Sequence, residues 1–141
     1  MHTILQPDGW VKPIGYANGV SARGRSIFVG GQIGWNKDCA FETHDLVDQI
    51  RQALANVVAV LACDGGSPEH VTSMTWYLID RRDYLARLRE IGDVYLRVMG
   101  RHFPAMTVVE VAGLVEDKAK VEIQATAVIP ENSTEVRARR G

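Results

Sequence analysis

One short stretch, Arg101 to Leu114, brings together residue types that could bind or act on a small molecule. It opens with a cation, a histidine and an aromatic ring, and after Pro104 it continues as a run typical of a β-strand. Met106 stands where the chain enters that strand, and there it could pack in the core or form the floor of a ligand site. Arg101 and His102 fit the end of a surface helix, where cations complement the helix dipole.

Three further positions could take part in the same chemistry. The adjacent glycines Gly30 and Gly31 lie at the end of a predicted strand, where glycine marks either a kink in the sheet or a close approach of the backbone to another group. Trp35 follows in a polar loop and could stack on a flat ligand. Glu122 lies in the last predicted strand, where a carboxylate is commonly solvated or paired with a neighbouring lysine such as Lys120.

Hydrophobic periodicity predicts the strands that must position these residues. Five strands are expected, at residues 16–21, 25–32, 70–80, 105–114 and 118–128. The first two read as a hairpin that turns at Gly24. The third has apolar or hydroxyl side chains on both faces, which predicts cover on both sides and places Trp76 in the core. In the last, alternate residues form one apolar face: Ala119, Val121, Ile123, Ala125 and Ala127.

Two helices are expected between these strands. The first is capped by Thr43 and ends at Gly65, with one apolar face. Its other face carries the polar residues Asp48, Gln49, Arg51, Gln52 and Asn56. The second is capped by Asp83 and ends at Gly100. Residues 1–14 are predicted to be irregular because proline and glycine interrupt them.

The predicted order is therefore β-β-α-β-α-β-β. Such an order indicates an α+β two-layer sandwich, in which two helices cover one face of a mostly antiparallel sheet. The other face mixes polar and β-branched residues. A small sheet with such an open face often buries it against another subunit.

Length and composition suit one soluble domain. The chain has 141 residues, of which 46% are hydrophobic, and this is enough for a core at this size. We assign the domain to residues 1–130 and a polar C-terminal tail, with basic residues at Arg137, Arg139 and Arg140, to residues 131–141. A formal net charge of −1 argues against a nucleic-acid partner.

The two cysteines predict neither a disulfide nor a metal site. Cys39 lies in a polar loop and is expected to be exposed, whereas Cys63 ends an apolar helix pattern and is expected to be a small buried residue. Neither belongs to a C-x-x-C motif or a His/Cys cluster. No signal peptide or membrane span is recognised, so a cytoplasmic protein is the expectation.

Five motifs in this order resemble one family. They read IGYANGV, FVGGQIG, QIRQALANVVAVLACDGGSPEHVTSMTWYLID, HFPAMTVVEVAGL and KVEIQATAVIP. From Ile14 to Pro130 the chain resembles the Rid (reactive intermediate deaminase) superfamily, also known as the YjgF or L-PSP endoribonuclease family. The resemblance implies a chorismate-mutase-like fold and homotrimers whose sheets form a central barrel. It also implies small-molecule clefts between subunits, and hydrolysis of enamines or imines such as 2-aminoacrylate without a metal or organic cofactor.

The resemblance also implies roles for single residues. Tyr16 matches the pocket tyrosine of the family, and Gly31, next to Gly30, matches the glycine whose backbone faces the ligand. Glu122 matches the glutamate that positions a catalytic water. We expect Trp35 to form a pocket wall.

The ligand-facing strand departs from the family pattern at one position. The motif P-A-R-[ST]-x-V-E-V reads P-A-M-T-V-V-E-V here, so Met106 replaces the arginine that clamps the substrate carboxylate, and Val108 lies further along the same strand. A thioether cannot make the charge-assisted pair of hydrogen bonds that a guanidinium makes. Such a bond is worth roughly 1.5–3 kcal/mol. Arg101 and His102 could replace the lost cation from the preceding loop.

We therefore predict a hydrolytic enamine or imine deaminase with a larger or less acidic substrate than 2-aminoacrylate. An aromatic ring-cleavage product would suit a methionine-lined pocket. Two other functions remain open. One is a ligand-binding or chaperone-like trimer without turnover. The other is an endoribonuclease, which the absence of an evident basic groove and of a histidine or lysine acid–base set disfavours.

Overall fold

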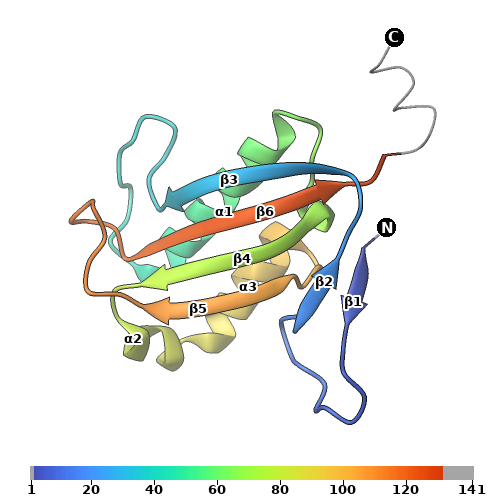
Figure 1. Cartoon of the computed structure of the whole chain (residues 1–141). Coiled ribbons are helices and arrows are strands. Elements are labelled where there is room, and N and C mark those ends of the chain that lie inside the picture. The colour runs from blue at the N-terminus through green and yellow to red at the C-terminus, as the bar shows by residue number, and fades with distance from the viewer. Residues whose placement is uncertain (1, 132–141) are drawn as a thin grey trace.

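A four-stranded sheet with helices on one face makes up the body of the protein in the computed structural model, which describes residues 2–131 (Figure 1). The strands lie in the order β3 (Arg25–Ile33), β6 (Val121–Ile129), β4 (Val71–Leu78) and β5 (Ala105–Glu110). Only the β4–β5 pair is parallel, so the expected α+β architecture with a mostly antiparallel sheet is confirmed. The predicted basic tail at residues 137–140 lies outside the described residues.

The parallel pairing of β4 and β5 requires a crossover, which two helices supply. The predicted single helix is wrong in this respect, because α2 (Arg81–Ala86) and α3 (Leu88–Met99) are separate, so that residues 2–131 contain three α-helices including α1. Asp80, rather than Asp83, caps α2 by accepting hydrogen bonds from the backbone N–H groups of Arg82 and Asp83. The break falls at Arg87, whose φ of −127° is not helical.

Helix α1 (Leu46–Ala62) lies across β3 and β6, and its N-cap is Asp45 rather than the predicted Thr43. Thr43 instead accepts a hydrogen bond from the Asp45 backbone N–H at 3.0 Å. Gln49, predicted on the solvent face, is fully buried. Its side chain is one turn from Leu46 and Ala53 and therefore belongs to the stripe that faces the sheet.

The N-terminal residues form a small hairpin of their own beside the main sheet (Figure 1). Strand β1 (Thr3–Leu5) pairs antiparallel with β2 (Gly19–Ser21), so the predicted hairpin between β2 and β3 and the irregular N-terminus are both wrong. The chain before β2 is held at the start of β5 instead, because the Ala17 N–H donates to the Pro104 carbonyl at 3.0 Å. Ala17 also forms a parallel bridge with Ala105.

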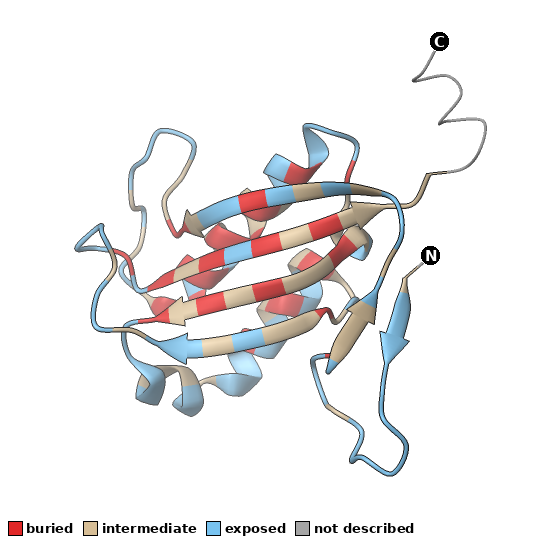
Figure 2. Cartoon of the chain, in the orientation of Figure 1, coloured by how far each residue is buried: buried red, intermediate tan, exposed pale blue. Residues whose placement is uncertain are grey.

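The core lies between the sheet and the helices, and Figure 2 shows it as buried residues that alternate along the strands. The predicted apolar face of the last strand is confirmed, because its five residues are at most 4% exposed. Trp76 is 2% exposed and packs against the rings of Tyr84 and Tyr95, as expected of a core residue. Cys39 is exposed as predicted, but Cys63 is exposed too, which corrects the prediction of a buried thiol.

Candidate functional site

Glu122 and Gly31 are brought together by an irregularity in β3. The register with β6 shifts between Val29 and Gln32, so Gly30 and Gly31 form a bulge. The neighbours of Glu122 on β6 are buried on the helix side, which places Glu122 on the open face of the sheet. A Cβ placed on Gly31 would lie 2.1 Å from Oε2 of Glu122. The carboxylate therefore rests directly against the glycine backbone, and a side chain at this position would displace it.

The Glu122 carboxylate has no partner within residues 2–131. It makes no ion pair and no hydrogen bond there, so the predicted alternative of a pair with Lys120 is not seen. An ionised carboxylate is a pure acceptor with about four lone-pair sites. In this chain those sites are available to water or to a ligand.

Tyr16 lies at a second place, at the start of β5. It is 44% exposed and lines a cavity of about 1560 Å³ between the N-terminal hairpin and residues 101–104. The position of Tyr16 is fixed by its neighbour Ala17, whose N–H bonds to Pro104. Arg101 and His102, the candidates to replace the lost cation, line the same cavity, whereas Gly31, Met106 and Glu122 do not.

Met106 and Val108 lie on the helix side of β5. They pair with Met74 and Trp76 of β4 and are half-buried against the core. Glu122 is on the opposite face, about 10 Å further along the strands and about 10 Å across them from Met106, since residues rise about 3.3 Å and neighbouring strands lie about 4.8 Å apart. Met106 therefore does not meet the Gly31–Glu122 pair within one chain.

Trp35 lies two residues beyond the end of β3, in a loop that is well ordered by hydrogen bonds. Its ring is half-buried and packs at a tilt on Phe41, with ring centroids 5.9 Å apart. The Asn56 side chain of α1 donates to the carbonyls of Ile33 at 3.1 Å and Trp35 at 2.8 Å. Asn56 thus anchors the predicted pocket wall, although the helical pattern places it on the polar face.

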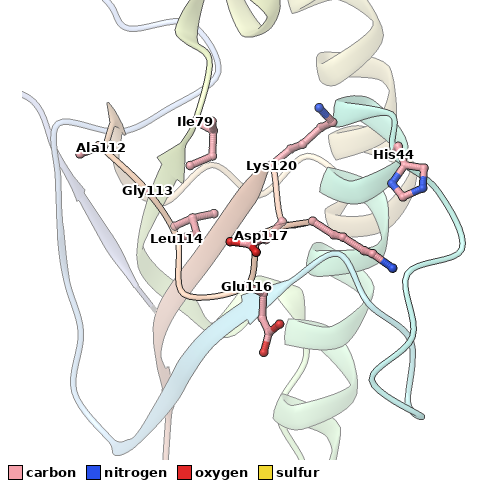
Figure 3. Close-up of a pocket in the computed structure, with 10 residues that line it drawn as sticks. His44, Ile79, Ala112, Gly113, Leu114, Glu116, Asp117 and Lys120 are labelled. Carbon is pink, nitrogen blue, oxygen red and sulfur yellow. The ribbon is translucent and has the colours of Figure 1, made fainter.

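A hollow of about 550 Å³ lies at the end of the sheet where the central strand β6 begins (Figure 3). Its rim is charged and includes His44, Glu116, Asp117, Lys118 and Lys120. The buried Gln49 joins α1 to the chain on either side of this hollow. Its amide N donates to the carbonyls of Thr43 and Lys118, and its amide O accepts from the Lys120 N–H at 2.8 Å. None of the predicted site residues lines the hollow, so we treat it as an adjacent surface and not as the site.

The phenol of Tyr95 on α3 supports the loop that lines the Tyr16 cavity. Burial raises the pKa of Tyr95 above its usual value, so the phenol stays protonated. It donates to the carbonyl of His102, and its ring stacks on Phe103 with centroids 5.6 Å apart. These contacts fix the loop that leads into β5.

Within residues 2–131 there is no group of three or more His, Cys, Asp or Glu side chains arranged to hold a metal ion. The same part of the chain contains no helix that is both long and apolar enough to span a bilayer.

Comparison with known proteins decides the family. The family described as Endoribonuclease L-PSP matches residues 11–129. A RutC family protein of Pyrococcus horikoshii is 34% identical over 129 residues, which cover 90% of this chain and 98% of the relative. The chain belongs to the Rid superfamily.

Two further similarities place this Rid protein among its relatives. The 2-iminobutanoate/2-iminopropanoate deaminase of Escherichia coli is 33% identical to it over 113 residues, which cover 80% of this chain and 86% of the enzyme. The crystal structure of the Rid family protein YyfB from Yersinia pestis superposes with a TM-score of 0.80 at 26% identity, covering 91% of this chain and 98% of that one. The predicted family and the α+β fold class are thus confirmed.

Proposed function

We propose that this Rid protein is a hydrolytic deaminase that converts enamines or imines to carbonyl compounds and ammonia. The observation that carries the proposal is the Glu122 carboxylate, which rests unpartnered against the Gly31 backbone at the bulge in β3. The similarity to a named imine deaminase of Escherichia coli supports the reaction class.

The proposed chemistry is addition of water to a C=N bond. Glu122 accepts a hydrogen bond from water and takes its proton as the oxygen attacks the imine carbon. Glu122 gives this proton to the imine nitrogen, which yields a tetrahedral carbinolamine. Glu122 then takes the hydroxyl proton and passes it to the amino group as the C–N bond breaks, which forms the C=O bond and releases ammonia. A backbone N–H at Gly31 polarises the substrate by donating to it where negative charge develops. An enamine enters the same sequence after protonation at carbon gives the imine.

The complete site is proposed to form between copies of the chain, in a homotrimer whose sheets face one another as a barrel. Support comes from the separation of two half-sites in one chain: Tyr16 lies beside the start of β5, whereas Glu122 lies on β6, with β4 between the two strands. The open face of the sheet also exposes an aromatic ring, Phe28, to 79%. A trimer would cover that face and supply Tyr16 from a neighbouring copy.

The substrate is proposed to differ from 2-aminoacrylate. Met106 is half-buried against the core and carries no charge, so it cannot clamp a small α-imino acid by its carboxylate. Such a substrate would lose its anchor and much of its orientation.

A panel of imines tests the proposal. An L-amino acid oxidase generates small and aromatic imino acids in the assay mixture. The rates of keto acid and ammonia release with the protein are compared with the uncatalysed rates in buffer. We expect faster release from an aromatic member than from 2-aminoacrylate, and a loss of about 10²–10⁴-fold in Glu122→Gln. Arg51→Gln, on the solvent face of α1, is the matched control. No acceleration with any imine would overturn the proposal, and RNA cleavage lost in Glu122→Gln would replace it with a ribonuclease.

A further inference from the structure

The cavity beside Tyr16 has a mostly apolar wall and a cationic rim. Its apolar lining comes from the N-terminal hairpin and the loop before β5: Ile4, Trp10, Ile14, Val20 and Phe103. Its permanently charged side chains are Lys12, Arg101 and Glu69. Two cations thus face one carboxylate, and Glu69 already accepts a hydrogen bond from the Ser67 hydroxyl at 3.0 Å. The charge balance favours an organic anion.

Arg101 stands out because its backbone is fixed while its side chain is free. The Gly100 N–H donates to the Leu96 carbonyl at 3.0 Å, and Gly100 adopts a φ of +71°, which ends α3. On the other side, the Tyr95 hydroxyl holds the His102 carbonyl. Within residues 2–131 the Arg101 guanidinium has no hydrogen bond or ion pair. The fixed backbone limits where the guanidinium can reach, and its unused donors are available to a ligand.

Arg101 is also close to the predicted half-site. It precedes Pro104 by three residues, a span of at most about 10 Å of extended chain, and the Pro104 carbonyl is bonded to Ala17, next to Tyr16. The cavity of about 1560 Å³ exceeds the roughly 300–1,000 Å³ of a typical ligand pocket. It therefore has room for a ligand much larger than a three-carbon acid.

We propose that Arg101 anchors the carboxylate of an organic acid whose aromatic or branched apolar body lies against the N-terminal hairpin, in the cavity that Tyr16 lines. Arg101 would then replace, from the loop before β5, the carboxylate clamp that Met106 lacks. This inference rests on the proposed function only where it takes the bound acid to be the substrate.

Binding of three simple probes to the full chain tests the inference by calorimetry. Phenylacetate carries both the ring and the carboxylate, phenylacetamide keeps the ring without the charge, and acetate keeps the charge without the ring. We expect phenylacetate to bind best. In Arg101→Met its dissociation constant should rise at least tenfold, whereas Arg101→Lys should recover part of the affinity. Arg97→Met is the matched control, since Arg97 is an exposed arginine in the last turn of α3 that does not line the cavity.

Several results would overturn the inference. One is that Arg101→Met binds phenylacetate as tightly as the parent does. Another is that the parent binds phenylacetamide as tightly as phenylacetate. The third is that phenylacetate does not bind at all. A change in oligomeric state in Arg101→Met, measured by light scattering, would instead assign the cavity to contact between copies.

Turnover separates this inference from the proposed function. If the protein deaminates an aromatic imino acid and Arg101→Met leaves its KM unchanged, the inference fails while the deaminase proposal stands. If phenylacetate binds through Arg101 but no imine is hydrolysed, the deaminase proposal fails while the binding site stands.

Discussion

Replacing Gly31 by alanine should inactivate the proposed site without unfolding the protein. The added Cβ would lie 2.1 Å from Oε2 of Glu122 and 2.7 Å from its carboxyl carbon. An ordinary contact begins at 3.4 Å, so the carboxylate must move by about 1.3 Å (3.4 − 2.1). A misplacement of about 1 Å can cost a reaction about 100-fold, so we expect kcat to fall by about that factor.

The same substitution should change stability little, for two reasons. Gly31 does not have a positive φ, so alanine is compatible with its backbone and should gain about 0.4–1 kcal/mol by restricting the unfolded chain. The group that must move is the end of a side chain, and an off-rotamer Glu122 costs about 0.5–1.5 kcal/mol. These effects nearly cancel, and we expect the free energy of unfolding to change by less than about 1 kcal/mol.

The measurements are kcat and KM on the best imine of the panel, together with urea unfolding of the same preparations. Gly30→Ala is the matched control, because nothing lies within 4 Å of a Cβ at Gly30. If Gly31→Ala keeps more than half of the parent kcat, or if Gly30→Ala loses as much, the position of the Glu122 carboxylate does not govern the reaction and the reasoning is refuted.

Three further substitutions test how the site is supported. Gln49→Leu leaves three backbone groups without their hydrogen-bond partners. The free energy of unfolding, measured by urea titration, should fall by about 2–4 kcal/mol. A fall of less than about 1 kcal/mol would contradict the anchoring role of Gln49. Arg87→Met removes the hydrogen bond that holds the pKa of Asp45 below its usual 3.8. A lowered carboxyl pKa stabilises the fold at pH values above the unfolded pKa, so the free energy of unfolding should be smaller in the variant than in the parent at pH 7. This difference should shrink as the pH falls below about 4. A difference that does not change with pH would show that the ion pair is not the cause. Tyr95→Phe removes the donor to the His102 carbonyl and should weaken phenylacetate binding several-fold in calorimetry while Arg101 remains; unchanged affinity would show that the loop is held by other contacts.

Regular periodicity explains which elements could be predicted. The last strand alternates every second residue with small apolar side chains on one face, and a two-residue period has no helical interpretation. Helix α1 could also be predicted, because its apolar residues recur at helical spacing over 17 residues. Both patterns are local, so they survive without knowledge of the rest of the fold.

The elements that were missed depend on distant contacts. Strands β1 and β2 have three residues each, too few for a period, and the chain just before β2 is held by a bridge from Ala17 to Ala105, which is 88 residues away in sequence. Gln49 lies on the buried stripe, but a polar side chain there is stable only because backbone groups 69 and 71 residues away accept and donate hydrogen bonds. Such partners are visible only in the folded chain.

In the candidate site, too, the residue types could be predicted from the sequence but their contacts could not. The residue types at Gly31 and Glu122 could be named from the motifs, but their contact depends on the register shift in β3. The separation of Met106 from Glu122, on opposite faces of the sheet, likewise follows from the pairing of β4 with both β5 and β6.

The position of β6 in the sheet has a consequence for how the protein is made. This strand lies between β3 and β4 but follows both of them in the chain, and its pairing with β3 joins Arg25 to Ile129. Neither β3 nor β4 can pair with β6 until residues 121–129 have been synthesised. Because contacts over such sequence distances slow folding, nascent chains that stop before residue 121 should expose two unpaired strand edges and depend on chaperones.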